Sequence, residues 1–474
     1  MKVLLTGSTG YIGKRLLPIL IEMGHEVVCC VRDPKRFDVS ASIKDKIQVI
    51  TVDLLDEASL AAIPKDIDAA YYLVHSMSTS EDYKSLEEKS AIHFRNALKN
   101  TQVQQVIYLS GIVNEDKLSK HLDSRKNVEI ELGKGAYNFT TLRAGIIIGS
   151  GSASFEIIRD LVEKLPVMIT PKWLDTKCQP IGISDVLAFL SKSLFQPKTY
   201  NKNYDIGGPD ILSYKEMLLN FAEERNLKRK IWVVPVMTPK LSSYWLYFVT
   251  STSYKLAKSL VNSMKIEVIC RDNSINEILG VTPISYREAI QKAFLKIESN
   301  EILSSWKDAY SSSGLSFNIS DFIHVPSFGC FTDKRSKTIE NREATIEKIW
   351  RIGGNTGWYY GNWLWSLRGI MDKMAGGVGL RRGRTSDIAI HVGDTIDFWR
   401  VLYANKEEGR LLLFAEMKLP GEAWLEFKIV DNKLEQSATF RPLGLGGRLY
   451  WYAVFPFHGF IFNGMLKSLA KQKK

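Results

Sequence analysis

The chain has 474 residues, 45% of them hydrophobic and 24% charged, which is the composition of a folded globular protein and excludes a disordered one. This length predicts roughly three domains, or one large domain with additions. The five cysteines show no CxxC or Cys/His spacing, so neither a metal site nor a disulfide framework is expected, and a reducing cytoplasm fits best. The N-terminus runs directly into an apolar strand and a glycine turn, which argues against a secretory signal.

The net charge of +11 is unevenly distributed. Residues 321–474 contain 23 Lys and Arg against 16 Asp and Glu, a surplus of seven positive charges. No helix-turn-helix, zinc finger or RNA-binding motif accompanies this charge. We therefore interpret it as a solvated basic surface rather than a nucleic-acid or lipid-surface patch, and we expect no nucleic-acid partner.

In the first 150 residues short apolar runs alternate with helical stretches, a pattern typical of βαβ units in a parallel sheet. The expected strands are Val3–Leu5, Val27–Val31, Ile47–Val52, Ala69–Val74, Val106–Leu109 and Thr140–Leu142. The expected helices are Tyr11–Met23, Tyr83–Lys99 and Leu122–Leu132. This order predicts an α/β fold with a doubly wound parallel Rossmann sheet. From about 151 to 300 the pattern is looser, and the helices expected there are Ser184–Leu194, Ser213–Glu224, Tyr244–Met264 and Ser285–Glu298.

A glycine turn, GSTGYIG at residues 7–13, joins the first expected strand to the first helix. A tight turn and a close backbone approach to pyrophosphate need residues without a Cβ, and the helix N-terminus offers unpaired N–H groups. An ordinary strand–helix turn is the alternative, but the position directly after a strand in a βαβ pattern favours a dinucleotide site. The residues expected to bind the cofactor here are Gly7, Thr9, Gly10, Tyr11, Ile12 and Gly13.

The residue after the second expected strand is Arg32, which lies 19 residues beyond Gly13. An acidic residue there would hydrogen-bond the ribose 2′-OH of NAD, whereas arginine suits the 2′-phosphate of NADP. Lys35 and Arg36 add positive charge nearby. A basic surface loop is the alternative, but the spacing favours NADP(H) as the cofactor.

Residues 310–316 (YSSSGLS) predict a boundary before a last domain, so we expect a first domain over 1–300 and a second over 320–474. Helices are expected at Thr345–Trp350 and Tyr359–Met374. Alternating apolar and polar residues with hairpin-like turns then predict an antiparallel α+β domain. Its expected strands are 387–392, 396–403, 411–419, Trp424–Val430 and 434–440.

The segment 449–466 has no formal charge over 18 residues, which only just reaches the length of a membrane-spanning helix. Pro456 and several polar and glycine residues lie inside it, so no integral membrane insertion is expected, although peripheral membrane contact stays open. We expect a helix through Tyr450–Leu469 that packs on the apolar face of the sheet. Bulky residues at 450–452 would hold it off the sheet centre and enclose an apolar pocket.

Several further motifs resemble those of extended and atypical short-chain dehydrogenases, including the NmrA-like group. Besides TGSTGYIG, these are VDLLD (52–56), YYLVHSM (71–77), YLSGI (108–112), LRAGIIIG (142–149) and YDIGGPDILSYKEM (204–217). The resemblance covers about residues 1–295. It implies that Asp53 and Leu54 contact the adenine and that His75 faces the cofactor crevice, where a local hydrogen bond is its alternative role.

The same resemblance implies a catalytic serine at Ser110. In that family a tyrosine four residues before a lysine donates the proton, but His121 and Arg125 stand in those two places here. Arginine can hold the ribose but cannot join a proton relay, whereas histidine can act as an acid near neutral pH. Either Ser110, His121 and Arg125 form a variant reductase site, or the domain binds NADP(H) without catalysis.

The last domain resembles the START-like, helix-grip fold and the uncharacterised domain that is fused to short-chain dehydrogenases in bacterial proteins. The matching segments are GDTIDFWRV (393–401), LPGEAWLEF (419–427) and ATFRPLGLGGRLYWYAVFPFH (438–458). Five aromatic residues precede the sheet: Trp358, Tyr359, Tyr360, Trp363 and Trp365. Core packing is the preferred interpretation of this cluster, and a ligand wall is the alternative.

Together these patterns predict a cytoplasmic, NADP(H)-dependent oxidoreductase that reduces a carbonyl or quinone-type apolar substrate near the Rossmann crevice. The alternative is a non-catalytic NADP(H) sensor or assembly factor. That alternative is suggested by the resemblance to NmrA-like regulators and, more distantly, to the short-chain-dehydrogenase-like accessory subunit of respiratory complex I. A membrane-attached protein held by its C-terminal segment is a third, weaker hypothesis.

Overall fold

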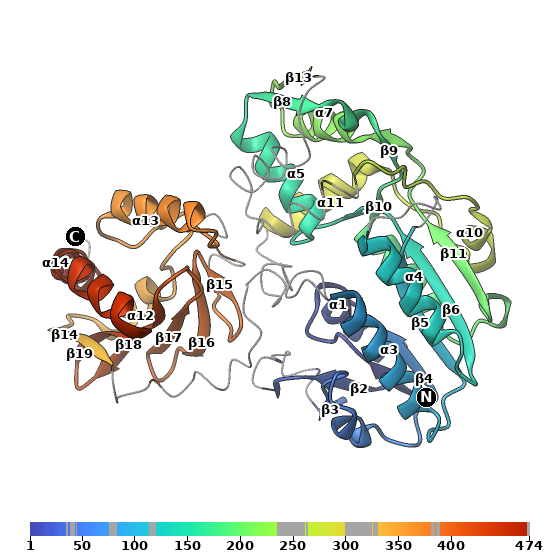
Figure 1. Ribbon diagram of the computed structural model, residues 1–474, viewed down its shortest axis with the longest axis horizontal. Coiled ribbons are helices and arrows are strands. Elements are labelled where there is room, and N and C mark those ends of the chain that lie inside the picture. Colours follow the sequence, from blue (N-terminus) through green and yellow to red (C-terminus); the bar gives the residue numbers. More distant parts are fainter. Residues whose placement is uncertain are drawn as a thin grey trace. The chain divides into compact units, whose positions relative to one another are not determined.

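The computed structural model describes residues 1–34, 37, 43, 45–74, 83–112, 120–234, 261, 264–298, 325, 330–380, 384 and 389–471. The chain divides into two compact units, Met1–Ser312 and Ser313–Lys474. In Figure 1 the first unit runs from blue to yellow and the second from orange to red. Each unit has its own sheet and its own hydrophobic core.

Seven parallel strands form the central sheet of the first unit, in the order β11-β6-β5-β4-β1-β2-β3. Their bounds are β1 (Lys2–Leu5), β2 (Glu26–Val31), β3 (Ile47–Thr51), β4 (Ala69–Tyr72), β5 (Gln105–Gly111), β6 (Asn138–Ala144) and β11 (Lys202–Ile206). The order reverses at β1, which pairs with β2 on one side and β4 on the other. This topology confirms the predicted doubly wound sheet, in which ligands bind beyond the carboxyl ends of the strands at the reversal.

Helices cover both faces of this sheet (Figure 1). One face carries α1 (Tyr11–Glu22) and α6 (Ile183–Ser193), and the other carries α3 (Tyr83–Leu98) and α4 (Lys120–Leu132). Strand β1 serves both layers, because Val3 and Leu5 belong to the core of the first face and Leu4 to that of the second. Strands buried on both faces are continuous apolar runs, which is the pattern that the sequence shows.

The rest of the first unit is a lobe built on α5 (Ala153–Lys164), α7 (Tyr214–Glu224) and α11 (Tyr286–Glu298). Phe155, Phe221 and Phe294 meet in its core, with ring centroids 5.4, 5.5 and 5.7 Å apart. Three short strand pairs belong to it: β7 (Ile147–Ile148) with β10 (Ile181–Gly182), β8 (Val167–Pro171) with β13 (Lys230–Val234), and β9 (Lys177–Cys178) with β12 (Leu212–Ser213). The unit also contains α10 (Ser274–Leu279), η2 (Glu57–Ala62), η3 (Lys172–Asp175) and η4 (Pro197–Thr199).

The helices expected near 184–194, 213–224 and 285–298 are confirmed as α6, α7 and α11. Helix α7 begins where it does because of a capping box: Ser213 Oγ accepts from the Glu216 N–H at 3.2 Å, and Glu216 accepts from the Ser213 N–H at 2.6 Å. Helix α5 was not expected, and the helix expected at Tyr244–Met264 lies almost wholly outside the described residues.

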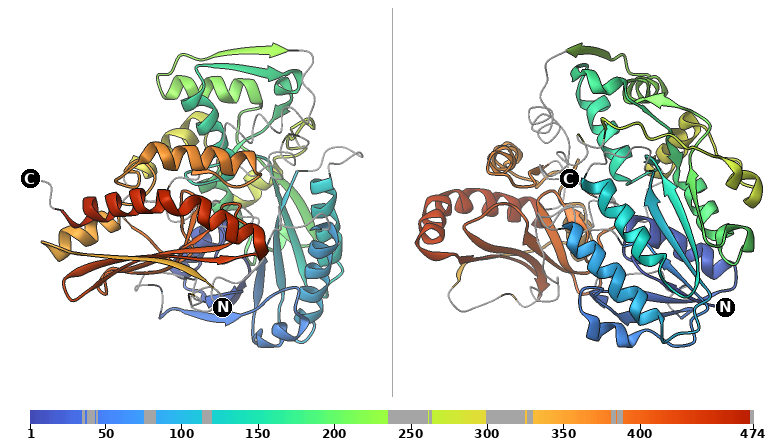
Figure 2. Two further views of the ribbon diagram at one scale, coloured as in Figure 1. Left: turned by 60° about the vertical axis from the view of Figure 1, so that its left-hand side comes forward. Right: turned by 45° about the vertical axis from the view of Figure 1, so that its right-hand side comes forward.

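The second unit has a six-stranded antiparallel sheet in the order β14-β19-β18-β17-β16-β15, and its described residues include the helices α12 to α14. The strands are β14 (Phe331–Thr338), β15 (Thr395–Ile396), β16 (Trp399–Asn405), β17 (Arg410–Ala415), β18 (Gly421–Val430) and β19 (Lys433–Pro442). The helices are α12 (Arg342–Ile349), α13 (Asn362–Met374) and α14 (Gly444–Ala470). Figure 2 shows α14 lying along one face of the sheet, which is the predicted helix-grip arrangement.

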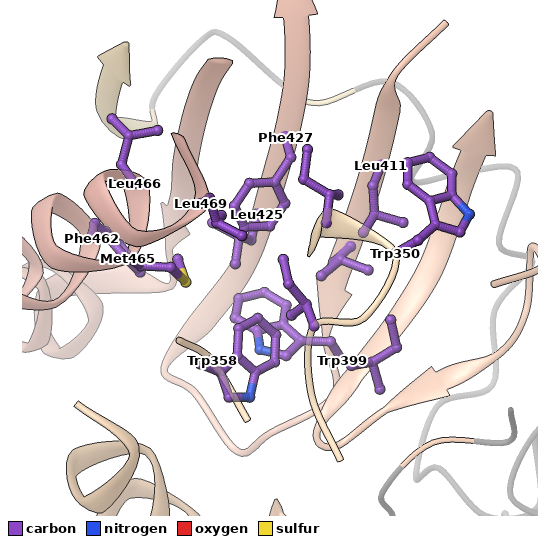
Figure 3. Packing of buried hydrophobic residues seen from close by; sticks show 14 of the residues in the cluster. Trp350, Trp358, Trp399, Leu411, Leu425, Phe427, Phe462, Met465, Leu466 and Leu469 are labelled. Atoms are coloured by element: carbon purple, nitrogen blue, oxygen red, sulfur yellow. The ribbon is translucent and has the colours of Figure 1, made fainter. Parts of the chain in front are cut away.

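Both ends of the C-terminal core are well packed. Figure 3 shows Met465 and Leu469 of α14 beside Leu425 of β18, and all three are fully buried. At the far side of the sheet Arg400 and Glu416 form an ion pair whose side chains are each only 2% exposed, with Nε and Oε1 2.8 Å apart. None of the helices in the described ranges is long and apolar enough to cross a membrane.

Several boundaries in the second unit differ from the expected ones. Residues 389–392 of the expected strand 387–392 are not a strand, β17 ends at Ala415 rather than at 419, and α13 begins at Asn362 rather than at Tyr359. The late start of α13 has a backbone cause, because Tyr359 and Gly361 have φ values of +60° and +62°, which a right-handed helix excludes. Strand β14 was missed because its sequence, FTDKRSKT, is mostly charged and polar, as is usual for an edge strand.

Candidate functional site

The glycine turn is packed so tightly that a side chain at its glycine positions would clash with neighbouring backbone atoms. Gly7 has φ +68°, and a Cβ on it would lie 2.7 Å from the carbonyl oxygen of Leu73. A Cβ on Gly13 would lie only 2.2 Å from the Gly7 carbonyl oxygen, and one on Gly10 would lie 3.1 Å from the same atom. The turn therefore folds back on the start of α1 and against the end of β4.

Two hydroxyl groups that the sequence analysis did not single out hold this turn in place. Thr6 Oγ1 donates to the carbonyl oxygen of Tyr71 at 2.9 Å and accepts from the N–H of Leu73 at 3.1 Å. Ser8 Oγ donates to the carbonyl oxygen of Cys30 at 2.9 Å. The turn is thus tied to β4 on one side and to β2 on the other. In the sequence, Thr6 and Ser8 stood out only as small hydroxyl residues on either side of Gly7.

The first turn of α1 is left available to a ligand. The helix begins at Tyr11, and its N-cap, Gly10, has no side chain that could cap it. Thr9 and Ile12 are partly exposed. Uncapped N–H groups and the positive end of the helix dipole suit a pyrophosphate, so the residues present fit the phosphate part of a dinucleotide.

The side chain of Tyr11 packs inward. Its ring lies 4.1 Å from the guanidinium carbon of Arg15, and Arg15 Nη2 donates to the carbonyl oxygen of Ser150 at 2.9 Å. A Cβ on Gly149 would lie 2.6 Å from the Tyr11 hydroxyl, so the glycine that ends LRAGIIIG makes room for this ring. Burial raises the pKa of Tyr11 to about 12. Tyr11 therefore joins the cofactor turn to the segment after β6.

Arg32 is exposed directly after β2, where the sequence analysis placed it. The next residue, Asp33, is only 5% exposed and was not among the predicted site residues. A buried carboxylate at the end of β2 is the kind of group that accepts from ribose hydroxyls, so two residues of opposite charge lie side by side at the carboxyl end of β2. Lys35 and Arg36 lie outside the described residues.

Asp53 and Leu54 form a fixed turn after β3. Asp53 Oδ1 accepts from the N–H of Leu55 at 3.0 Å, and the Asp53 N–H donates to Ser59 Oγ at 2.9 Å. Leu54 is buried, and its carbonyl oxygen lies 3.1 Å from His93 Nδ1. Because β1, β2 and β3 are parallel neighbours, this turn shares the carboxyl edge of the sheet with the glycine turn and Arg32.

At the other side of the crevice, two of the three predicted catalytic residues adjoin Tyr108. Ser110, at the end of β5, is 2% exposed, and its buried hydroxyl lies close to the hydroxyl of Tyr108. The Nε atom of Arg125 is also buried, with no partner among the described residues. The Tyr108 hydroxyl donates to the Arg125 carbonyl oxygen at 3.5 Å, a weak bond.

Ser110 and Arg125 both influence the pKa of the buried Tyr108. Burial raises its pKa to about 12, and the charge of Arg125 and the nearby Ser110 hydroxyl oppose this shift. Tyr108 is thus neutral at physiological pH. His121 lies in the first turn of α4, but its side chain is outside the described part of the chain, and so is all of His75.

Comparison with known proteins agrees with this geometry. Residues 7–144 match a family model described as NAD(P)H-binding. The first unit is an NAD(P)-binding Rossmann domain. Residues 330–465 match a model described as a protein of unknown function, DUF2867.

Curated relatives of the NAD(P)-binding domain include reductases. The chain is 23% identical to a divinyl chlorophyllide a 8-vinyl-reductase, chloroplastic, from Zea mays over 44% of its length and 55% of that protein. It is 22% identical to an isoflavone reductase homolog from Lupinus albus over 47% of its length and 75% of that protein. The chain thus spans only about half the length of the vinyl reductase.

Among solved structures, a triphenylmethane reductase from Citrobacter sp. is similar with a TM-score of 0.51 and 14% identity, covering 62% of this chain and 100% of that one. At this identity the likeness shows the shared fold. It does not distinguish NAD from NADP.

Proposed function

We propose that the protein is an NADP(H)-dependent oxidoreductase that reduces an apolar, conjugated substrate such as a carbonyl or quinone. The observation that carries this proposal is the pairing of a sterically closed glycine turn with two buried polar groups beyond the strand-order reversal, the Ser110 hydroxyl and the Arg125 Nε, of which the second has no partner among the described residues. Curated relatives named as reductases, one acting on a vinyl group, support a reduction.

In this proposal each part of the site has a distinct task. The uncapped start of α1 binds the pyrophosphate, and Arg32 pairs with the 2′-phosphate. A bound nicotinamide supplies the hydride. The Ser110 hydroxyl donates a hydrogen bond to the substrate oxygen, Arg125 holds the ribose, and His121 delivers the proton near neutral pH.

The test is to measure the oxidation of NADPH by the purified chain with a panel of carbonyls, quinones and conjugated alkenes. Turnover with at least one class is expected, and it should be lost in Ser110→Ala while NADPH still binds. No turnover in the parent with any class would overturn the catalytic part of the proposal.

Cofactor choice needs its own measurement because Arg32 and Asp33 favour opposite partners. We expect tighter binding of NADPH than of NADH, and Arg32→Ala should reverse this order. Asp33→Asn is the matched variant, because it removes charge from the adjacent residue and should leave the preference for NADPH intact.

The second candidate function is a non-catalytic NADP(H) sensor. It is favoured by one observation, the replacement of the family's tyrosine and lysine by His121 and Arg125. Tight NADPH binding without turnover would support this candidate.

A further inference from the structure

The second unit contains a cavity of about 550 Å³ that no part of the proposed function uses. It lies between α13, α14, strands β18 and β19, and the loop 417–420. Its walls are mainly aliphatic and aromatic, including Leu364, Trp365, Trp399, Phe440, Trp451 and Ile461. A volume of this size is within the range of about 300–1,000 Å³ that is usual for small-molecule sites.

Helix α14 packs against β14 and β19, and bulky side chains at this contact set the spacing beside the cavity. Near the start of α14, a Cβ on Gly447 would lie 2.3 Å from the carbonyl oxygen of Pro420, so the helix is close there. Farther along, the Trp451 ring stacks between Phe331 and Phe440, with ring centroids 5.4 and 5.9 Å away and planes within 8°. This stack fills the space between the two layers at a fixed width.

Small side chains on the sheet complete the hollow. Ala423 of β18 and Ala438 of β19 line it where larger residues would fill it. Leu367, Met371 and Phe457 also line it and are 47%, 55% and 55% exposed, so the cavity opens to the surface between α13 and α14. A molecule can therefore enter without unfolding the unit.

Two buried indole groups beside the cavity lack hydrogen bonds. Trp365 and Trp399 are 7% and 5% exposed, and no described atom accepts from their Nε1–H groups. Their neighbour Trp358 differs, because its Nε1 donates to Asp397 Oδ2 at 2.8 Å. Buried donors without partners are unusual in proteins, and the described residues offer these two N–H groups no acceptor.

The imidazole of His458, which also lines the cavity, is neutral. His458 Nδ1 is buried without a described partner, and its ring packs against Trp451 and Phe462. Burial lowers the pKa of His458 to about 4, with Asp333 opposing the shift and Arg335 adding to it. The imidazole is therefore uncharged at physiological pH and belongs to the apolar part of the wall.

Charge is confined to one part of the lining. The charged residues among those that line the cavity, all in the described part of the chain, are Arg368 and Lys418, and both are basic. Arg368 Nη2 donates to the carbonyl oxygen of Lys418 at 3.3 Å, and the N–H of Lys418 donates to Asp372 Oδ1 at 2.6 Å, so these bonds hold the Arg368 guanidinium and the Lys418 backbone in place. The carboxylate of Asp372 is buried beneath this loop and also accepts from the Gly379 N–H.

We propose that the second unit binds a small amphipathic anion, whose apolar body fills the cavity and whose acidic head lies at Arg368 and Lys418. An apolar body alone would fit the walls, but two cationic side chains in the lining favour a carboxylate, sulfonate or phosphate head. The inference does not depend on the proposed reductase activity.

The test compares two dyes that share an apolar body and differ in charge. The full chain, saturated with NADPH so that the dinucleotide site is filled, is titrated with 1-anilinonaphthalene-8-sulfonate and with neutral N-phenyl-1-naphthylamine. We expect one site that binds the sulfonate more tightly. The double variant Arg368→Gln/Lys418→Gln should weaken sulfonate binding about five- to tenfold, as two partly exposed charge pairs would, and leave the neutral dye unchanged.

Control variants separate this site from general surface effects. Lys406→Gln/Lys433→Gln removes the same charge elsewhere in the unit and should change neither dye. Ala423→Leu/Ala438→Leu should abolish binding of both dyes without lowering the melting temperature. If that variant does not fold, Ala423→Val alone should weaken both.

Displacement of the sulfonate by palmitate or by 2-naphthoate would support the site and separate a lipid source from a free aromatic acid. Equal affinities for the two dyes would overturn the assignment of an anionic head. Binding that is insensitive to the cavity variants would overturn the site itself.

Discussion

Replacing Gly13 by alanine tests how strongly the dinucleotide site depends on the close approach of α1 to the glycine turn. The new Cβ would lie 2.2 Å from the Gly7 carbonyl oxygen, 2.8 Å from its carbon and 2.9 Å from the Ser8 Cα. All three are backbone atoms, so no side chain can rotate away. Because carbon contacts are optimal at about 3.5–4.0 Å, the start of α1 must move outward by on the order of 1 Å.

This shift should affect both folding and binding. Forcing a methyl group into a filled space typically costs about 1–3 kcal/mol of unfolding free energy, and the backbone contacts place Gly13→Ala at the upper end. The N–H groups of the first turn move with the helix, so NADPH and NADH should lose similar affinity. A loss of about 1.4–3 kcal/mol, or roughly ten- to a hundredfold in Kd, is expected from one or two charge-assisted hydrogen bonds.

Gly10→Ala is the matched control, because its Cβ would have one close neighbour, at 3.1 Å, which a few tenths of an ångström would relieve. We expect a loss below about 1 kcal/mol in both urea unfolding and fluorescence titration with NADPH. Equal NADPH affinity for the parent and Gly13→Ala would refute the reasoning. A larger effect at Gly10 than at Gly13 would do the same.

Four further perturbations address single interactions. Arg32→Ala should weaken NADPH selectively by about 1.5–3 kcal/mol, and a parent that binds NADH more tightly in calorimetry would contradict this. His121→Phe should abolish turnover while NADPH affinity stays nearly constant; unchanged turnover would exclude His121 as the acid. Glu416→Gln, in the ion pair that is 2% exposed, should cost about 3–5 kcal/mol of stability, whereas Glu426→Gln, in a partly exposed pair on the same sheet, should cost below about 1 kcal/mol by denaturant titration. His458 has its pKa lowered from 6.5 to about 4 in the folded state, so the unfolded chain binds more protons between these values. Stability should therefore be fully present above pH 6.5 and fall by up to about 3 kcal/mol as the pH falls to 4, and His458→Asn should flatten this dependence.

The fold of the first unit could be predicted from the sequence because its strands are buried on both faces and therefore form continuous apolar runs. The glycine turn could be predicted because the absence of a Cβ is a property of a residue type. Thr6 and Ser8 could not, since a hydroxyl that donates to a distant carbonyl oxygen looks like any other small polar residue. Asp33 was not predicted as a site residue because the position directly after the second strand is occupied by Arg32, which alone was expected to contact the cofactor.

In the second unit, the strands with alternating apolar and polar residues could be predicted from the sequence, whereas the edge strand β14 could not. Its residues alternate between partly buried and exposed, and its polarity protects the sheet edge rather than marking a core. A pocket between the sheet and the last helix was expected, and the cavity is there, but α13 as its second wall was not foreseen. The preferred interpretation of the aromatic cluster, core packing, holds for Trp358 and Trp365; Trp365 also lines the cavity, and a role as a ligand wall stays a prediction.

Arg125 stands where the dehydrogenases that the first unit resembles have a lysine. A guanidinium stays charged at any physiological pH, so Arg125 requires acceptors whether or not the protein is an enzyme. Its buried Nε has none among the described residues, and a ribose hydroxyl of the cofactor could supply one. Cofactor affinity should therefore depend on Arg125 in a reductase and in a sensor alike. Proton delivery is different, because arginine cannot provide it and the buried Tyr108, with a pKa raised to about 12, is a weak acid. The choice between the two functions thus depends on His121 and Ser110 rather than on Arg125.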